Sequence, residues 1–201
     1  MKKDSDEERS RYFLSFRDFA CILTASTDGE ALTSIDLLQK GRKVDNHSEK
    51  IFLDSHHLIT EEGVMNWKDN FSFPKQEESS LLITCAQQIK EYFYGERRAF
   101  TIRWRIEQGS DFQRKVWSAL ERIPYGVTVS YAGLAGEIVS DKKKARTYAR
   151  AVGRAVGANP IPIVIPCHRV IGSNGELVGF AGGLAWKETL LNLELLPEYR
   201  K

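Results

Sequence analysis

The most informative stretch of this chain runs from Asn159 to Val170 and reads Asn-Pro-Ile-Pro-Ile-Val-Ile-Pro-Cys-His-Arg-Val. It joins an apolar run bracketed by prolines to one cysteine that directly precedes a histidine. A thiol is a good nucleophile only as the thiolate, and a neighbouring imidazole or guanidinium is the usual means of lowering its pKa from about 8.5. Cys167 is therefore a candidate nucleophile. The alternative for any single cysteine is a buried and inert small hydrophobe.

The composition is that of a globular protein with one or two domains, since the chain has 201 residues, of which 42% are hydrophobic and 28% charged. The polar start, Met1 to Arg11, does not resemble a secretory signal, and no segment approaches the roughly 18 apolar residues of a membrane span. Three widely spaced cysteines, Cys21, Cys85 and Cys167, fit a reducing compartment. We expect a cytoplasmic protein, nucleoid-associated if the source is bacterial, with no membrane partner.

The charge is unevenly distributed between the two halves of the chain. Residues 1–100 hold 14 Lys and Arg against 18 Asp and Glu, a net charge of −4, whereas residues 101–201 hold 15 against 9, a net charge of +6. A polyanion-binding module attached to a neutral or acidic domain gives such a pattern, although solvated surfaces also vary by several charges. The second half is thus a candidate for binding nucleic acid.

Local patterns predict strands and a helix in the first half. Two apolar runs, 19–24 and 31–38, flank Asp28-Gly29, which is a strong hairpin signal. Residues 41–75 are mixed and polar, and we expect loops and short helical pieces there. Apolar residues three and four apart over 77–94 predict an amphipathic helix that ends near Gly95. Residues 96–106 alternate in polarity and predict a strand and a linker.

In the second half, helix signals follow one another closely. Ser110 is placed to cap a helix that stops at Ile123-Pro124, and Ser130 to cap a short helix over 131–139. A third helical stretch covers 142–158, and a last helix covers 184–195. The helices over 131–139 and 142–158, joined by a polar turn, make a helix-turn-helix candidate. We place a domain boundary near residue 105, giving an α+β domain with a polar tail (1–105) and a DNA-binding domain (106–201).

One face of the 142–158 helix is cationic and has little bulk. Arg146, Arg150 and Arg154 recur at four-residue intervals beside Ala149 and Gly153. Small residues permit close approach, so this face suits a groove with phosphate walls. The alternative is an ordinary solvated basic face.

Pro-Cys-His-Arg-Val at 166–170, preceded by Asn159, Arg150 and Ser130-Tyr131, resembles the O6-alkylguanine-DNA alkyltransferases, also called methylated-DNA–protein-cysteine methyltransferases. The resemblance is continuous over about 111–196 and looser before. It implies an α+β protein: a small N-terminal domain of ribonuclease-H-like shape, followed by a mostly helical, helix-turn-helix (winged-helix-like) domain that binds the minor groove of double-stranded DNA.

The resemblance also implies a direct repair reaction. Cys167 would irreversibly accept the alkyl group of O6-alkylguanine, once per protein molecule, and O4-alkylthymine is a second candidate substrate. His168 would take the thiol proton through water, and Glu188 would orient that histidine. Asn159 would pin the turn before the active-site strand, and Tyr131 would donate a hydrogen bond to guanine N3.

The remaining residues implied by the resemblance bind DNA or line the base pocket. Arg150 would take the place of the flipped nucleotide in the base stack. The DNA-binding set comprises Arg150, Arg146, Arg154, Tyr131, Ala149, Gly153 and Arg169. The pocket set comprises Tyr131, Pro162, Val170, Phe180 and Ala181. Ala181 departs from the family pattern, because a serine stands there in better-known relatives, and the smaller side chain raises the hypothesis that bulkier alkyl groups are admitted.

We expect a monomer with no cofactor and no metal, since Cys21, Cys85, His47, His56 and His57 lack zinc-like spacing. Two other function classes stay open at this point. One is a binding module that recognises alkylated DNA without reacting, against which the intact Cys167 argues. The other is a cysteine hydrolase that uses Cys167 and His168, for which the sequence offers no peptidase context.

Overall fold

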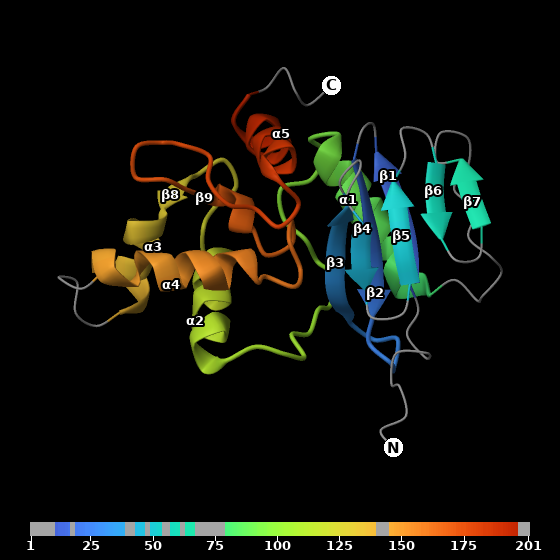
Figure 1. The fold of residues 1–201 in the computed structure, drawn as a ribbon, viewed down its shortest axis with the longest axis horizontal. Coiled ribbons are helices and arrows are strands. Elements are labelled where there is room, and N and C mark those ends of the chain that lie inside the picture. Colours follow the sequence, from blue (N-terminus) through green and yellow to red (C-terminus); the bar gives the residue numbers. More distant parts are fainter. Residues whose placement is uncertain are drawn as a thin grey trace.

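The computed structural model describes residues 11–16, 19–38, 43–46, 49–53, 57–60, 63–66, 79–139 and 145–196. Figure 1 shows two lobes side by side: the strands of the first half with helix α1, and a mostly helical second half. The predicted α+β class is confirmed. The ribonuclease-H-like and winged-helix-like descriptions of the two lobes, and the boundary at residue 105, stay predictions.

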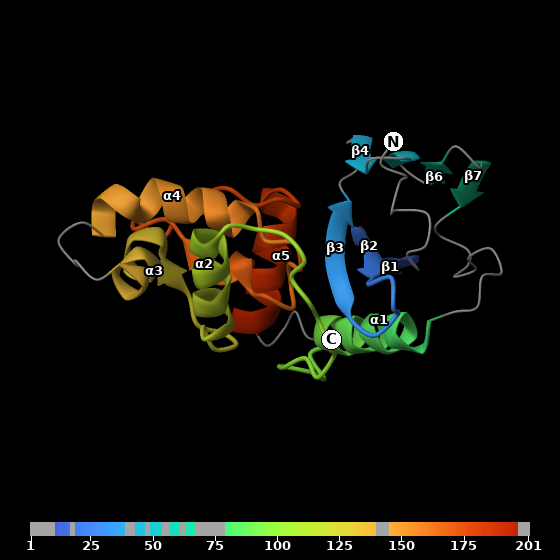
Figure 2. The same cartoon turned by 90° about the horizontal axis from the view of Figure 1, so that it is seen from below.

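The first lobe is built on a three-stranded antiparallel sheet covered by one helix. The order is β1 (Arg11–Phe16), β2 (Phe19–Ala25) and β3 (Leu32–Leu38), with β2 in the centre. The predicted hairpin is confirmed as β2–β3, and Gly29 in its turn has a φ of 69°, which glycine adopts without strain. Strand β1 was not predicted. Helix α1 (Ser80–Phe93), also predicted, packs against all three strands (Figure 2).

A second antiparallel sheet corrects the expectation of loops and helical pieces over 41–75. It consists of β4 (Lys43–Asn46), β5 (Glu49–Leu53), β6 (His57–Thr60) and β7 (Gly63–Asn66), in that order. Strands of four or five residues are too short to give a clear alternation of polar and apolar residues. Antiparallel pairing is made by the backbone, so mixed sequences can form it without a strong side-chain signal.

The second lobe confirms most of the predicted helices. Helix α2 (Asp111–Glu121) begins with a capping box at Ser110, and α3 (Tyr131–Ile138) begins with Ser130 as its cap. Helix α4 (Ala145–Gly157) and helix α5 (Leu184–Leu195) follow. The short strands β8 (Val129–Ser130) and β9 (Val170–Ile171) pair in parallel. The alternating segment 96–106 forms a single bridge, Trp104 to Leu32, rather than a full strand.

The two lobes share one hydrophobic core, with α5 at their junction. The Trp186 indole donates a hydrogen bond to the Leu38 carbonyl at 3.0 Å, and its ring lies 6.0 Å from that of Phe93. The backbone N–H of Ile35 donates to the Pro160 carbonyl at 2.9 Å. The sheet and α1 of the first lobe therefore bear directly on the turn and helix that carry the predicted site.

Candidate active site

The turn before Cys167 is fixed by the side chain of Asn159. Its Nδ2 donates to the Ile165 carbonyl at 2.8 Å, and its Oδ1 accepts from the Ile161 N–H at 3.1 Å. Between these anchors, Ile163 has a φ of 74° although it is β-branched, a conformation that surrounding structure must impose. The predicted contact of Asn159 with this turn is thus present, and it lies where the backbone is strained.

Cys167 lies in a short 3-10 turn, η2 (Cys167–Arg169), and not in the expected strand. The residue is only 3% exposed. Burial raises the pKa of the thiol to about 11, and a hydrogen bond from the Asn159 side chain opposes part of that rise. At neutral pH the sulfur is therefore protonated, and it needs a base before it can act as a nucleophile.

His168 is fully buried and has one ring nitrogen available. Its Nε2 lies 2.9 Å from Oε1 of Glu194, while Nδ1 has no hydrogen-bond partner among the described residues. Burial lowers the pKa of the imidazole, although Glu194 opposes that shift. The histidine is consequently neutral, with its proton on Nε2 facing the carboxylate and a lone pair on Nδ1. A neutral imidazole with a fixed orientation and a lone pair on Nδ1 can serve as a general base for a group within its reach.

The carboxylate that orients His168 is Glu194, so the prediction of Glu188 for this place is wrong. Glu188 is exposed on α5, whereas Glu194 is buried. The two positions are six residues apart on one helix, so they face different directions. Glu194 also accepts from the Gly126 N–H at 2.9 Å. Hydrogen bonds from His168 and Arg169 hold the pKa of this carboxyl far below its ordinary value, so it is ionised.

Arg169 is buried as well, and its predicted role in DNA binding is wrong. The residue is 7% exposed, and its guanidinium donates to both oxygens of Glu194, at 2.8 to 3.1 Å, and to the Ile123 carbonyl at 2.6 Å. A neighbouring cysteine, histidine and arginine read from sequence do not reveal which of them faces solvent. Here the arginine neutralises the buried carboxylate instead of a phosphate.

Tyr131 and Lys187 meet beside the cysteine. The Tyr131 hydroxyl donates to the carbonyls of Val178 (3.0 Å) and Gly179 (3.3 Å), and the Lys187 ammonium lies 5.6 Å from the centre of the Tyr131 ring. Lys187 is fully buried and donates to the carbonyls of Val170 (2.6 Å) and Val178 (2.9 Å). Burial lowers its pKa to about 8, and Cys167 opposes that shift.

Sequence reasoning missed Lys187 because a lysine on a helix is most often solvated. The signal that could have revealed it is a helical spacing shared with apolar residues. The buried side of α5 carries Lys187, Leu190, Leu191 and Glu194 at intervals of three and one residues. Lys187 and Glu194 are charged residues within an apolar stripe. Buried charges need hydrogen bonds or counter-charges, which other segments of the fold must supply.

The predicted pocket residues divide between buried and open positions. Pro162 and Val170 are buried, Phe180 is half-buried against the core, and Ala181 is exposed. Tyr131 is half-buried, and burial is the main cause that raises its pKa to about 12, followed by Cys167. The structure thus brings Tyr131, Val170 and Cys167 into one region, with Phe180 and Ala181 on the loop that follows β9.

The predicted DNA-binding face lies on α4. Arg150 and Arg154 are exposed, and Ala149 and Gly153 are half-buried. The side chain of Arg146 is outside the described part of the chain. The opposite side of α4 is anchored in the core by Val152, Ala155 and Val156, and the Trp117 indole of α2 donates to the Ala155 carbonyl at 2.8 Å. The exposed arginines therefore stand on a rigid element.

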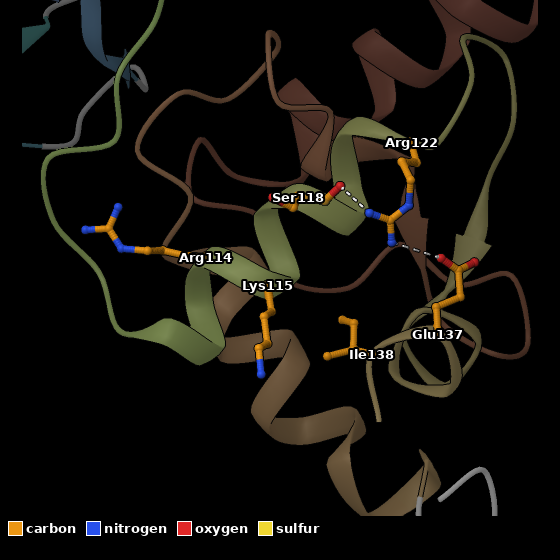
Figure 3. Close-up of a pocket in the computed structure, with 6 residues that line it drawn as sticks. All are labelled: Arg114, Lys115, Ser118, Arg122, Glu137 and Ile138. Carbon is orange, nitrogen blue, oxygen red and sulfur yellow. Dashed lines mark hydrogen bonds and ion pairs between the residues drawn. The ribbon is translucent and has the colours of Figure 1, made fainter. Parts of the chain in front are cut away.

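A separate hollow lies between α2 and α3 (Figure 3). It is lined by Arg114, Lys115, Ser118, Arg122, Glu137 and Ile138. Arg122 donates to the Ser118 carbonyl at 3.0 Å and lies 3.9 Å from Glu137. None of the predicted site residues belongs to it.

No group of three or more His, Cys, Asp and Glu that could hold a metal ion occurs in the part of the chain that the structure describes. His47 and His56 lie outside the described residues. Within the same residues, no helix combines the length and the apolar character needed to cross a membrane.

Comparison with known proteins relates the chain to one family. Residues 111–196 match the family described as 6-O-methylguanine DNA methyltransferase, DNA binding domain. The constitutive methylated-DNA–protein-cysteine methyltransferase of Bacillus subtilis is 43% identical over 145 residues, which are 72% of this chain and 84% of that protein. The methylated-DNA–protein-cysteine methyltransferase of Methanosarcina acetivorans is 43% identical over 129 residues, 64% of this chain and 74% of its own length.

The architecture has a counterpart among solved structures. The crystal structure of Mycobacterium tuberculosis OGT in complex with DNA superposes with a TM-score of 0.65 at 32% sequence identity and covers 92% of each chain. The likeness therefore extends over both lobes and not only over the segment around Cys167.

Proposed function

The chain belongs to the methylated-DNA–protein-cysteine methyltransferase family, and from this premise we propose that Cys167 is its alkyl acceptor in the repair of O6-alkylguanine in DNA. One observation carries the proposal: the buried thiol is followed by a neutral histidine whose Nδ1 is unpaired among the described residues and whose Nε2 is tied to Glu194. This arrangement supplies a nucleophile, a candidate base that follows it in the chain, and a carboxylate that orients the base.

The proposed reaction moves one proton and one alkyl group. Nδ1 of His168 takes the thiol proton through a bridging water, and Glu194 stabilises the imidazolium. The sulfur then forms a bond to the alkyl carbon while the bond from that carbon to O6 breaks. Its electron pair passes to the guanine ring, where Tyr131 donates a hydrogen bond to N3. The guanine anion takes up one proton from solvent while His168 releases the one it accepted, so the thioether and the guanine are both neutral products.

Tyr131 must change partners to play this part. In the structure its hydroxyl donates to Val178 and Gly179, and its high pKa keeps the proton on the phenol oxygen. Guanine N3 would replace these carbonyls as the acceptor. The product is a thioether at Cys167, which has no easy hydrolytic exit, so each molecule acts once.

Access to Cys167 requires that the base leave the helix. The sulfur is buried, and the alkyl group on guanine O6 lies on the major-groove side of a base that is held in the stack, so the nucleotide has to be rotated out into the protein. We propose that α4 enters the minor groove of duplex DNA, that Arg150 takes the vacated place in the stack, and that Arg154 and Arg146 contact phosphates. The helix-turn-helix then comprises α3 and α4 within a winged-helix-like domain (106–201), and residues 1–105 form a ribonuclease-H-like domain.

The chain would act as a monomer in the cytoplasm, on the nucleoid if the source is bacterial. Ala181, exposed on the loop beside the proposed pocket, supports a tolerance for bulky O6-alkyl groups and for O4-alkylthymine. Comparing alkyl-transfer rates on methyl and benzyl lesions for the wild type and Ala181→Ser tests this, and an unchanged ratio of rates removes it.

Intact-protein mass tests the acceptor directly. After incubation with duplex DNA that carries O6-methylguanine, we expect the wild type to gain one methylene unit on the Cys167 peptide and Cys167→Ala to gain none. Cys85→Ala is the matched control, because Cys85 is a buried free cysteine on α1 whose pKa burial raises to about 12.

Two outcomes would overturn the proposal. Release of methylated product with repeated turnover would indicate a hydrolase, and binding without any mass change would indicate a recognition module.

A further inference from the structure

Tyr92 brings a hydroxyl from the first lobe to the centre of the proposed active site. It lies on α1, is fully buried, and donates to Oε1 of Glu194 at 2.5 Å. The same hydroxyl lies 3.4 Å from Nε2 of His168. Tyr92 is 76 residues before His168 in the sequence, so only the packing of α1 against the second lobe creates this contact.

Three groups share one carboxylate oxygen at this point. Oε1 of Glu194 accepts from Tyr92, from His168 and from the Arg169 guanidinium. A carboxylate oxygen has a limited capacity for hydrogen bonds, and each donor withdraws charge from the lone pairs that the others use. The strength of the Tyr92 bond therefore affects how strongly Glu194 stabilises a proton on His168.

Few charged or titratable groups surround this pair, and one of them, the Lys187 amine, has a pKa that burial lowers to about 8. The elements packed around Tyr92 and His168 supply the Glu194 carboxylate, the Arg169 guanidinium, the Lys187 amine and the Tyr125 phenol. The Cys167 thiol directly precedes His168. Burial and the Glu194 charge raise the pKa of Tyr92 well above its ordinary value, so its hydroxyl keeps its proton and acts as a donor near neutral pH.

We propose that Tyr92 is a positioning residue for alkyl transfer: its hydroxyl, supplied by the first lobe, shares Glu194 with His168 and thereby sets the proton affinity of His168. The inference rests on the proposed function, in which His168 is the base that takes the Cys167 proton. Without the hydroxyl, the carboxylate would bind the imidazolium more strongly. His168 would then be protonated up to a higher pH and be unable to accept a proton there.

The ring of Tyr92 is held independently of its hydroxyl. It lies 5.5 Å from the Phe100 ring and meets the Tyr125 ring edge-on at 6.0 Å. Tyr92→Phe keeps these contacts and removes only the donor. Glu194 retains its bonds from Arg169, Gly126 and His168 in that variant.

Tyr125→Phe is the matched control. Tyr125 is an aromatic residue of the same cluster, but its hydroxyl donates to the Leu193 carbonyl at 3.2 Å. Removing this hydroxyl perturbs the same interface without changing the bond from Tyr92 to Glu194.

The experiment measures the single-turnover rate of alkyl transfer from saturating O6-methylguanine duplex between about pH 5 and 8.5, using the full chain. For Tyr92→Phe we expect the acidic limb of the pH–rate profile to move up by on the order of one pH unit, with a rate near pH 8 within about twofold of wild type. Tyr125→Phe should keep the wild-type limb. Coincident profiles, or equal shifts in both variants, would overturn the inference.

A second variant should shift the acidic limb in the opposite direction, to lower pH, and it tests the inference even if Tyr92→Phe does not fold. Replacing Tyr92 by 3-fluorotyrosine keeps the hydroxyl and makes it a stronger donor, so the acidic limb should move to lower pH; an unmoved limb would contradict the inference. If the wild type fails to accept the alkyl group at all, the proposed function itself is wrong. If it accepts the group and neither change at Tyr92 moves the limb, only the role of Tyr92 is wrong.

Discussion

The turn η2 and the exposed face of α4 both carry arginines, yet the two regions use them in opposite ways. In the turn, Arg169 is buried against Glu194 and makes hydrogen bonds to both of its oxygens. On α4, Arg150 and Arg154 are exposed, and the opposite side of the helix is packed in the core. The first arrangement satisfies a buried carboxylate, and the second leaves two cationic side chains in contact with solvent.

The difference concerns how much each residue depends on its neighbours. Removing one partner from a buried ion pair leaves an uncompensated charge in an apolar environment, which destabilises strongly. An exposed arginine is solvated whether or not it is bound, so its loss affects binding and leaves the fold intact. The buried network should therefore respond to substitution in stability, and α4 should respond in DNA affinity.

The largest effect is expected for Glu194→Gln. The substitution leaves the Arg169 guanidinium buried without its counter-charge, so the free energy of unfolding should fall by about 3–5 kcal/mol in a denaturant titration. Glu188→Gln, on the exposed side of the same helix, should change it by less than about 0.5 kcal/mol. Equal costs at the two positions would mean that burial does not distinguish them.

A smaller effect, on the order of 2 kcal/mol, is expected from the pH dependence of Lys187. Its pKa is about 8 in the folded protein against an ordinary value of 10.5. Below pH 8 both states hold the proton, and burial of the charge destabilises the fold. Between pH 8 and 10.5 the unfolded chain keeps the proton and the folded protein loses it, so this destabilisation disappears as the pH rises.

Lys187→Met provides the measurement. The free energy of unfolding of the wild type, relative to that of Lys187→Met, should increase from pH 7.5 to 10, as followed by denaturant titrations at each pH. Lys115→Met, on the exposed side of α2, should run parallel to the wild type. A constant difference between the wild type and Lys187→Met would show that the buried amine keeps its ordinary proton affinity.

The smallest effect belongs to the exposed face. Arg150→Ala should reduce repair of duplex O6-methylguanine by about tenfold, because a stacking side chain contributes about 1–3 kcal/mol. Reaction with free O6-benzylguanine should be unchanged, and so should stability. Arg122→Ala, which alters a cation of the hollow in Figure 3, is the control. Equal losses on the duplex and on the free base would argue against base flipping by Arg150.

Local signals were sufficient for the helices and for the β2–β3 hairpin. Ser110 and Ser130 predicted the starts of α2 and α3, and the last helix was predicted with the bounds that α5 has. Helix caps and apolar periodicity involve residues within one or two helical turns, so they can be recognised from residues that are close in sequence. The sheet over 43–66 was missed because its strands pair through the backbone and are too short to show a pattern.

The candidate site was predicted less completely, because its contacts are distant in sequence. Cys167, His168 and Asn159 lie within one motif and could be selected together. The choice of Glu194 over Glu188, the burial of Arg169 and the contact from Tyr92 depend on which faces meet when α1, η2 and α5 pack. No spacing rule within α5 distinguishes its two glutamates without knowing which side the core occupies.

The amino-acid sequence alone therefore determined the α+β class and the helices and singled out Cys167 as the candidate nucleophile, since these follow from interactions between near neighbours along the chain. Tertiary structure decided which charged side chains are buried and which face water. That choice follows from desolvation: a carboxylate or guanidinium is stable inside the protein only where distant segments supply its counter-charge and hydrogen bonds.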